Sequence, residues 1–541
     1  MKRNLKRLAD ETFDLLVVGG GITGACVARD ASLRGLKVAL IERNDFANAT
    51  SAHNSKLVHG GLRYLRNLEL GLVRESLKER RIWQRIAPHL VHPLRFLVPL
   101  YNAGLRGRAT LSAGLTLYDL LSYDRAWLED PDQQLRGHCW LGARDALAQE
   151  PVLERPGFEG AFAYSDAQMY SPERLALECL IDADAHGAAV ANYVEAKSFT
   201  ARGGRAEGVS AIDKLNDLRF NIRASVTLVA TGPWSDIFLA SALGKPASHR
   251  ILRSKGIHLL VPSLTHGHAI TMATEAGHFF VLPWRGHTLL GTTDTEFTGD
   301  PDSLSVSERD VEDFLAFINK HLPSAHLERD HVTHFYAGLR PLVDDGSGDT
   351  YGASRRSELI DHGREDGVDA VFSAIGGKWT TSRDLAQKIV DAIGAKLGRS
   401  LAPCTTATLR LPGARFERLR EFIVQQKTLH RSAASTHLIH MYGARLTRLF
   451  AETQNRPDLL EPLGSHDDIA AQIVFAAREE MAMTLSDAIL RRTGVGQFGP
   501  PPRPVLERAS RLIGAELGWS EERRQNEIES LAPCFETREA A

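Results

Sequence analysis

The feature that most constrains this fold is a Gly19-x-Gly21-x-x-Gly24 pattern that joins a strand-like run to a helix-like run. An apolar run over residues 13–18 leads into these glycines, and helix-compatible sequence covers residues 22–34. A second apolar run covers residues 37–42. A strand, a helix and a second strand within about thirty residues predict a βαβ unit with parallel strands.

Each glycine of this pattern has its own use in binding a dinucleotide. The first allows a tight turn, the second lets backbone approach a pyrophosphate, and the third lets the helix pack closely on the strand. The pyrophosphate then lies at the helix N-terminus, where free N–H groups and the dipole favour anions. Glu42 ends the second run, where a carboxylate accepts hydrogen bonds from ribose hydroxyls. Because this acid disfavours a 2′-phosphate, FAD or NAD is a better candidate than NADP.

Two distant segments favour FAD over NAD. Residues 226–232 read as a strand followed by Ala-Thr-Gly, and residues 374–377 end in a glycine pair before a helix start. Both have the pattern of a late return of the chain to the same nucleotide-binding sheet. A simple NAD domain closes within one continuous stretch and needs no such return.

Composition excludes several classes of protein. The chain has 541 residues, with 65 Lys and Arg against 67 Asp and Glu, so its formal net charge is −2. That length corresponds to about two to four domains, and the charge gives no case for a nucleic-acid partner. Five scattered cysteines without a CxxC pair argue for a reducing compartment and against a zinc or iron–sulfur site. We expect neither a signal peptide nor a transmembrane helix, because no apolar stretch is long enough.

Apolar periodicity predicts further elements along the chain. A charged amphipathic helix is expected over 68–86, and Ser171 with Pro172 is typical of a helix start. Residues 278–284 and 287–293 flank Arg285-Gly286 and predict a hairpin. After about residue 400 the pattern is nearly all helical, with helices expected over 415–426, 437–452, 467–490 and 505–517.

The segment 50–64 is the most unusual part of the sequence. It is rich in hydrogen-bond donors, glycines and cations and has little apolar periodicity. We interpret it as a loop that passes beneath a flavin and carries Arg63 and Tyr64 toward a substrate. The alternative interpretation is a solvated loop that precedes the helix over 68–86.

Several further motifs follow the glycine pattern in order along the chain. They are 55–64 (SKLVHGGLRY), 230–234 (ATGPW), 291–294 (GTTD), 338–342 (GLRPL) and 376–381 (GGKWTT). Together they closely resemble the motifs of one family, the FAD-dependent, quinone-linked glycerol-3-phosphate dehydrogenases of the aerobic type. The resemblance covers roughly residues 12 to 500 and is weakest after residue 400, although residues 488–493 (AILRRT) also resemble that family's C-terminal domain.

The resemblance implies oxidation of sn-glycerol 3-phosphate to dihydroxyacetone phosphate, with electrons passed through FAD to a membrane quinone. A phosphate dianion needs several fixed donors, and arginine supplies planar, bidentate ones. Arg63 and Arg340 are therefore the expected substrate-binding cations, assisted by Tyr64 and Lys378.

Oxidation of a secondary alcohol also requires a base for the hydroxyl proton, and histidine titrates near neutrality. His258 matches the family's site histidine and is the first candidate, and His59 is the second. A guanidinium such as that of Arg340, or a lysine, is the alternative group that would steer the developing alkoxide. The residues expected to contact FAD are Gly19, Gly21, Gly24, Glu42, Thr50, Ser51, Ser55, Lys56, Leu57, Gly60, Gly232, Gly377, Lys378 and Thr380.

The predicted fold class is α/β, with a Rossmann-like FAD-binding domain, an inserted mixed β-sheet substrate domain of the D-amino-acid-oxidase-like kind, and an all-helical C-terminal domain. We expect the FAD-binding domain at 1–92 with returns near 150–235 and 335–400. The substrate or cap domain is expected at 93–149 and 236–334, and the helical domain at 401–541.

A quinone acceptor implies contact with a bilayer, so the resemblance predicts a cytoplasmic protein attached peripherally to the inner (cytoplasmic) membrane. The mixture of basic, aromatic and apolar residues between Arg80 and Arg108 suits an interfacial segment; its members are Arg81, Trp83, Arg85, Arg95, Phe96, Tyr101, Arg106 and Arg108. The alternative is an ordinary amphipathic surface packed on the core. The helical domain is expected to cap the site or to support a homodimer.

Two other functions are compatible with the same fold. An amine or amino-acid oxidase that uses molecular oxygen would need one arginine for a carboxylate instead of a cluster of phosphate-binding cations. A non-catalytic protein that binds FAD as a structural ligand is the second alternative.

Overall fold

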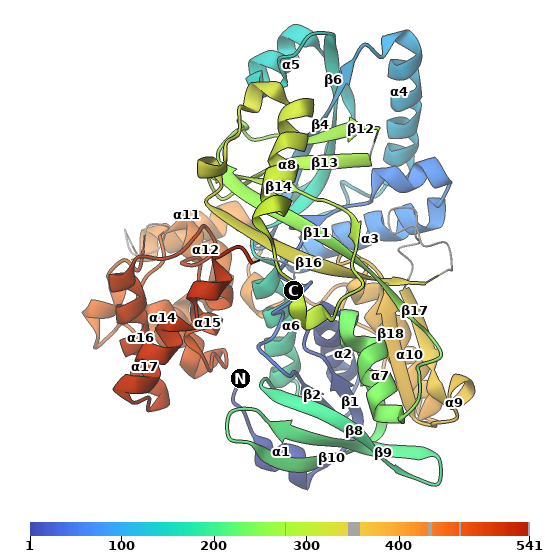
Figure 1. Cartoon of the computed structure of the whole chain (residues 1–541), viewed down its shortest axis with the longest axis vertical. Helices are drawn as coiled ribbons and strands as arrows, with labels where there is room; N and C mark the ends of the chain where they lie inside the picture. The colour runs from blue at the N-terminus through green and yellow to red at the C-terminus, as the bar shows by residue number, and fades with distance from the viewer. Residues whose placement is uncertain (276, 345–356, 431–434, 465–466, 539–541) are drawn as a thin grey trace.

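The computed structural model describes residues 1–275, 277–344, 357–430, 435–464 and 467–538. Figure 1 shows three parts: a first sheet with its helices in the lower half, a second sheet in the upper half, and a group of helices at the left. No helix of the described residues is long and apolar enough to cross a membrane.

The predicted βαβ unit is confirmed and forms the centre of the first sheet. Strands β1 (Thr12–Val18) and β2 (Val38–Ile41) pair in parallel, with Leu15 opposite Val38. Helix α2 (Ile22–Leu33) connects them. All four residues of β2 are buried, as expected for a parallel strand that is covered on both faces.

Later parts of the chain complete the first sheet. β10 (Leu218–Val229) pairs in parallel with β1, and β18 (Val371–Gly376) pairs in parallel with β10, so both predicted returns lie in this sheet. The strand order is β17-β18-β10-β1-β2-β7. The remaining strands of this sheet are β7 (Ala189–Ala191), β8 (Val194–Arg202), β9 (Arg205–Asp213) and β17 (Ser357–Asp361).

The second sheet is mostly antiparallel and contains the predicted hairpin. β13 (Gly277–Trp284) and β14 (His287–Gly291) pair with Trp284 opposite His287. β11 (Ile251–Pro262) pairs with both β14 and β16 (His334–Val343). The other strands are β3 (Leu57–Val58), β4 (Val91–Tyr101), β5 (Cys139–Gly142), β6 (Phe158–Met169), β12 (Ala269–Thr274) and β15 (Thr295–Glu296).

Strand β6 departs from the predicted division of the chain. It lies in the segment 150–235 that was expected to return to the FAD-binding sheet, but it pairs with β4 along eleven residues of the second sheet. Only the part of that segment after β6 joins the first sheet, through β7 to β10. The reason is long-range pairing: the complementary strand β4 precedes β6 by some sixty residues, so local sequence carries no sign of it.

The predicted helix start at Ser171 is confirmed, because the Ser171 hydroxyl accepts the Arg174 N–H at the beginning of α6 (Pro172–Ala185). Helices α7 (Ser235–Leu243) and α10 (Ser382–Lys396) follow β10 and β18. The remaining helices of this part of the chain are α1 (Leu5–Asp10), α3 (Leu70–Ile86), α4 (Gly104–Leu121), α5 (Ala143–Gln149), α8 (Glu308–His321) and α9 (His362–Glu365).

The C-terminal part is helical, as predicted. The helix expected over 467–490 is interrupted, however, since Met481 has a positive φ of 58° and Thr484 caps a new helix with a capping box to Asp487. The helices are α11 (Leu419–His430), α12 (Thr436–Tyr442), α13 (Leu446–Ala451), α14 (Ala471–Glu479), α15 (Leu485–Asp487), α16 (Arg503–Leu517) and α17 (Glu521–Glu529).

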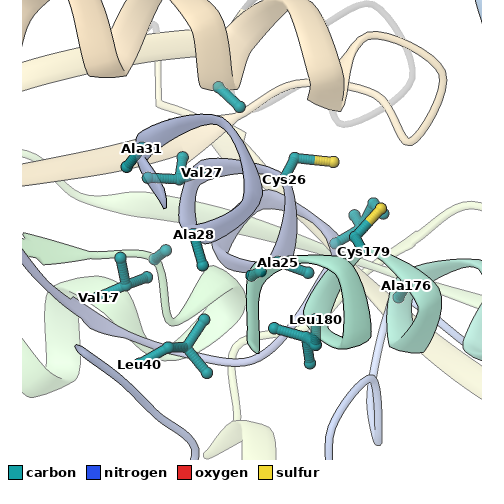
Figure 2. Close-up of a cluster of buried hydrophobic side chains, with 14 of the residues drawn as sticks. Val17, Ala25, Cys26, Val27, Ala28, Ala31, Leu40, Ala176, Cys179 and Leu180 are labelled. Atoms are coloured by element: carbon teal, nitrogen blue, oxygen red, sulfur yellow. The ribbon is translucent and has the colours of Figure 1, made fainter. Parts of the chain in front are cut away.

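Small side chains let α2 approach its neighbours closely. Figure 2 shows α2 between the strand residues Val17 and Leu40 on one side and α6 on the other. Ala25 and Ala28 are fully buried at this contact. Close packing on both sides fixes the N-terminus of α2 at the end of β1.

The structure corrects the predicted interfacial segment between Arg80 and Arg108. Trp83 is fully buried on α3, where its ring packs against Trp379 and its Nε1–H donates to the Thr380 carbonyl. Phe96 is also fully buried, in β4. These aromatic residues therefore belong to the core, and the exposed part of the segment begins near α4.

Candidate active site

A cavity of about 2030 Å³ lies between the two sheets. Its lining includes Val18, Ile41, Ala230 and Gly376, which lie at or just beyond the carboxyl ends of the parallel strands β1, β2, β10 and β18. Ligands of open α/β sheets bind at this edge. Pockets for small ligands usually have about 300–1,000 Å³, so this cavity has room for a dinucleotide and a further molecule.

The glycine pattern forms a cradle that side chains would fill. Gly19 has a φ of +118°, and a Cβ atom on it would lie 2.4 Å from the Ala230 carbonyl oxygen. A Cβ on Gly24 would lie 2.0 Å from the Gly19 carbonyl oxygen. Gly21 is less crowded, since its Cβ would lie 3.1 Å from Ser51 Oγ. The tight turn and the close helix–strand contact thus both depend on glycine.

Glu42 directly follows β2 and lines the cavity. Its Oε2 accepts the Gly20 N–H at 2.7 Å, and its Oε1 accepts the Asn44 N–H at 2.9 Å. Burial raises the pKa of this carboxyl, and the two N–H donors oppose that rise. The carboxyl group is therefore oriented by backbone beside the glycine turn, as ribose recognition requires.

The residues present fit FAD. The glycine cradle and Glu42 provide for pyrophosphate and ribose, and Ser51 Oγ is fixed at the start of α2 by the Ile22 N–H at 2.9 Å. Gly232 and Gly377 line the cavity beyond β10 and β18, both with positive φ. The loop 50–57 extends along the cavity from this end, and Thr50 ties it to the second sheet through the Leu339 carbonyl.

A group of cations lies in the cavity wall beyond the glycine turn. The Lys378 ammonium lies 3.8 Å from the centre of the Tyr64 ring and donates to Ser76 Oγ at 3.0 Å. Arg63 donates to the Tyr64 hydroxyl at 3.3 Å. Gly61, at a φ of +77°, makes room for this arrangement, since a Cβ there would lie 2.3 Å from the Tyr64 ring. Two positive charges from distant parts of the chain thus flank one aromatic ring.

Arg340 enters the cavity from the second sheet. It lies on β16 opposite Ser254 of β11, and its guanidinium donates to Ser254 Oγ at 2.7 Å and to Thr292 Oγ1 at 2.8 Å. Asp294 is farther away, with its Oδ2 3.7 Å from Arg340 Nη1. The hydroxyl partners hold the planar fork in a fixed direction, which favours recognition of an anion.

Two neutral imidazoles line the same cavity. His59 has its pKa lowered to about 3 by burial, with Lys378 and Arg63 as further causes. His278 has its pKa lowered to about 3 by burial and then by Arg63. Both rings contact Phe280 edge-on, with centroid distances of 6.4 Å and 5.0 Å. At neutral pH both rings are uncharged and can accept a proton or a hydrogen bond.

His258 lies behind the cavity wall. It is 2% exposed, its Nε2 lies 2.9 Å from Ser55 Oγ, and its ring stacks on Tyr336 at 5.0 Å. Burial, followed by the charge of Arg340, holds the pKa of His258 well below its usual range. Ser55 lines the cavity, so His258 reaches it through that hydroxyl.

Most residues predicted for the site line this one cavity, and three do not. Gly24 packs α2 on β1, as described above. Gly60 directs its N–H to the Tyr118 hydroxyl at 3.0 Å, and a Cβ there would clash with Leu77, so its position reflects packing. His258 is the third. The predicted residues in the lining are Gly19, Gly21, Glu42, Thr50, Ser51, Ser55, Lys56, Leu57, His59, Arg63, Tyr64, Gly232, Arg340, Gly377, Lys378 and Thr380.

Sequence reasoning missed two features of the site. The first is His278; alternation along the predicted hairpin strand puts it on the same face as Phe280 and could have singled it out. The second is a set of hydrogen bonds at the cavity wall, in which the Asp302 carboxylate accepts from the Arg43 guanidinium and from the Trp234 ring N–H. No local signal connects these three residues, because they come from three separate segments.

Comparison with known proteins agrees with this geometry. Residues 14–387 match the model of a family described as FAD dependent oxidoreductase. Residues 404–524 match a family described as the C-terminal domain of alpha-glycerophosphate oxidase. The division between the two matches lies close to the start of the helical C-terminal part.

Individual proteins are similar over nearly the whole chain. A protein of Synechocystis sp. named glycerol-3-phosphate dehydrogenase is 36% identical over 99% of this chain and 98% of its own length. One of Staphylococcus aureus named aerobic glycerol-3-phosphate dehydrogenase is 31% identical over 91% of this chain and 88% of its own. The structure of a Bacillus halodurans glycerol-3-phosphate dehydrogenase complexed with FAD superposes with a TM-score of 0.78 at 28% identity, covering 98% of this chain and 95% of that one.

Proposed function

Because this chain belongs to the family of FAD-dependent oxidoreductases and, within it, to the glycerol-3-phosphate dehydrogenases, we propose that it oxidises sn-glycerol 3-phosphate to dihydroxyacetone phosphate. The observation that carries the proposal is the set of three cations, Arg63, Lys378 and Arg340, in the wall of the cavity that also contains the dinucleotide cradle. A phosphate dianion requires such a set, whereas a carboxylate substrate would require one arginine.

The chain's own residues have separate roles in this reaction. Arg63, Lys378 and Arg340 bind and orient the phosphate. The chemistry that FAD supplies when it is bound is acceptance of the hydride. His59 is the proposed acceptor of the hydroxyl proton, since of the two predicted histidines it is the one that lines the cavity.

His258 is assigned a positioning role through Ser55. Its Nε2 contacts the Ser55 hydroxyl, and Tyr336 stacks on one face of its ring.

Substrate binding also affects the proposed base, His59. A bound phosphate dianion offsets part of the positive charge of Lys378 and Arg63, which lower the pKa of His59. The dianion therefore raises this pKa toward the range of an effective base.

The test is reduction of the bound flavin without oxygen. Addition of sn-glycerol 3-phosphate to the oxidised holoenzyme should bleach the flavin absorbance, and dihydroxyacetone phosphate should appear in equal amount. Bleaching by an amino acid but not by the phosphoester would identify an amine or amino-acid oxidase. Bleaching by neither would identify a protein that binds FAD without catalysis.

A membrane quinone is the proposed electron acceptor, and a membrane surface is the proposed location. Support comes from α4, whose exposed residues Leu105, Ala109, Ala113, Thr116 and Leu120 recur on one uncharged helix face. Arg106 and Arg108 flank that face, an arrangement typical of helices that lie in a lipid interface. Leu105 is 86% exposed and Leu120 is 66% exposed.

Co-sedimentation with vesicles that contain anionic lipid tests the location. The unmodified protein should sediment with the vesicles, and Leu105→Asp combined with Leu120→Asp should leave it in the supernatant. Thr537→Asp, at the other end of the chain, is the control and should still sediment. Equal sedimentation of all three proteins would rule out α4 as the attachment site.

A further inference from the structure

After its last helix the chain leaves the helical part and returns to the cavity. Leu531 is fully buried in the core of the helical part. A short 3₁₀ turn at Ala532–Cys534 follows, and we call residues 532–538 the C-terminal strap. Figure 1 shows the C-terminus near the middle of the molecule, between the helical group and the two sheets. The strap residues that line the cavity are Pro533, Cys534, Glu536 and Arg538.

The strap lies at the mouth of the cavity. Its four lining residues are all exposed, and a residue that both lines a cavity and meets solvent belongs to the rim. Two other segments contribute to the same rim. Ile237 of α7 lines the cavity and is 43% exposed, and Asp302 lines it and is also exposed. The mouth is therefore bounded by segments that lie far apart in the sequence.

Two hydrogen bonds hold the end of the strap beside α8. The Arg538 N–H donates to the Val306 carbonyl at 2.9 Å. The Thr537 hydroxyl donates to Oε2 of Glu308, the first residue of α8, at 3.2 Å. Arg538 is exposed, and Thr537 and Glu308 are half-buried. Contacts of this kind open locally at a small cost in free energy.

Between its two ends the strap crosses the start of β16. The centre of the Phe535 ring lies 5.7 Å from the centre of the His334 ring, and His334 also lines the cavity. Phe535 packs on the apolar core of the helical part as well. One side chain of the strap thus contacts both the helical part and the second sheet.

The end of the strap is connected to the residues that follow Glu42. The segment 301–306 that accepts the Arg538 N–H also contains Asp302. The Asp302 carboxylate accepts from Arg43 at 3.0 Å, and Arg43 directly follows Glu42. The strap therefore ends on the segment that borders the dinucleotide cradle.

The beginning of the strap lies close to the buried ion pairs of Asp45. Arg491 binds Asp45 at 2.6 Å and lines the cavity together with Cys534. Burial raises the pKa of Cys534, and the charges of Arg491 and Arg538 oppose that rise. Residues 43–45 thus anchor the surroundings of the strap at both ends, and the strap crosses the mouth between the two anchors.

We propose that the C-terminal strap forms the outer wall of the FAD site and closes its mouth, so that FAD enters and leaves only when the strap opens. The dinucleotide cradle determines where FAD binds, and the anchors at residues 43–45 place the strap across that end of the cavity. Opening breaks two hydrogen bonds at one end, while the buried Leu531 keeps the other end attached.

Exchange of bound FAD for isotope-labelled FAD tests this proposal. The oxidised holoenzyme is mixed with an excess of labelled FAD, and mass spectrometry follows the ratio of the two bound cofactors. Thr537→Val combined with Arg538→Pro removes the hydroxyl and the N–H that hold the end of the strap. Thr537→Ser combined with Arg538→Ala keeps both donors and is the matched control.

The variant without the two donors should exchange FAD at least about fivefold faster than the unmodified protein, because each lost bond helps to keep the strap closed. The matched control should exchange FAD within about twofold of the unmodified rate. Equal rates in the variant and the control would overturn the proposal, whether both stay slow or both become fast.

A second pair of variants covers loss of FAD during purification. If the double variant does not retain FAD, Thr537→Val is compared with Thr537→Ser in the same exchange experiment. Faster exchange in Thr537→Val by more than about twofold supports the strap, and a smaller difference overturns it. The flavin stays oxidised in all of these measurements, so failure of the proposed substrate to reduce it would leave this result intact.

Discussion

At the scale of single residues, the cations of the cavity are oriented by hydroxyl groups. Ser76 accepts from Lys378, the Tyr64 hydroxyl accepts from Arg63, and Ser254 and Thr292 accept from Arg340. A hydroxyl fixes the direction of a cation and leaves its charge intact, whereas a carboxylate at the same distance would cancel that charge. The hydroxyl groups orient these side chains for a dianionic ligand, and Arg340 also lies 3.7 Å from the Asp294 carboxylate.

Arg340→Ala is expected to raise the KM for sn-glycerol 3-phosphate by about ten- to hundredfold, because it removes a charge-assisted contact of about 1.5–3 kcal/mol. Steady-state kinetics measures the effect. Arg309→Ala, on the exposed side of α8, is the control and should leave KM unchanged. A KM for Arg340→Ala equal to that of the control would remove Arg340 from the substrate site.

The buried imidazole of His278 predicts a loss of stability in acid. Its pKa is lowered to about 3 by burial and by the nearby Arg63, His59 and Arg340, with Asp294 opposing the shift. The unfolded chain has the ordinary histidine value near 6.5, so it binds more protons than the folded chain between about pH 6.5 and pH 3. This contribution to stability is complete above about pH 6.5 and is lost as the pH falls toward 3.

His278→Asn should therefore weaken the dependence of stability on pH. The temperature of unfolding, followed by release of flavin fluorescence, should fall less between about pH 7.5 and pH 5 in the variant than in the unmodified protein. His326→Asn is the control, since His326 is exposed and asparagine tolerates its positive φ. If the unfolding temperature falls equally with pH in all three proteins, His278 does not contribute to the loss of stability in acid.

At the scale of elements, the contact between α2 and β1 sets the position of the helix N-terminus. A Cβ on Gly24 would meet the Gly19 carbonyl oxygen at 2.0 Å, and backbone cannot move aside as a flexible side chain can. On its other side α2 is confined by α6, as Figure 2 shows. Displacement of the helix would therefore distort the glycine turn that faces the cavity.

Gly24→Ala is expected to raise the dissociation constant for FAD by at least about tenfold, because the new methyl group pushes α2 away from β1. Fluorescence titration of the stripped protein with FAD measures this constant. Gly71→Ala, near the start of α3 where a Cβ meets no atom, is the matched control and should keep the normal constant. Normal affinity in both variants would contradict the role assigned to this contact.

At the scale of the whole molecule, a buried ion-pair group joins the helical part to the dinucleotide site. Asp45, three residues after Glu42, accepts from Arg491 Nε at 2.6 Å and from two nitrogens of Arg492 at 2.7 and 2.8 Å. Despite burial, the two guanidinium groups lower the pKa of Asp45 to about 2. The helical part is thus fixed beside the segment that follows β2 and contains Glu42.

Asp45→Asn should destabilise the holoenzyme by about 3–5 kcal/mol, because it removes the carboxylate that the buried Arg491 and Arg492 share, although Arg491 keeps its ion pair with Asp487. Calorimetric unfolding would show the loss, and the helical part should become the first region cut by protease. Asp313→Asn removes an exposed carboxylate of α8 and serves as the control. Equal stability of the two variants would mean that the ion pairs of Asp45 do not help to hold the helical part against the first sheet.

Local sequence was sufficient for the elements that local interactions determine. The βαβ unit, the cap at Ser171 and the hairpin around Arg285-Gly286 could be predicted because their signals lie within a few residues of each other. The burial of Trp83 and Phe96 in the core could not be predicted, because the sequence of an amphipathic segment does not say whether its apolar face meets lipid or protein. In the fold, Trp379 and the strands of the second sheet cover these residues.

The sequence by itself determined which chemistry is present: a dinucleotide cradle, an acidic ribose ligand and arginine, lysine and histidine residues in recognisable motifs. Only the tertiary structure decided which of them meet. It brought Arg63, Arg340 and Lys378 to one cavity, placed His258 behind Ser55 and added His278. The physical reason is that these contacts join segments hundreds of residues apart, whose approach depends on the packing of two complete sheets.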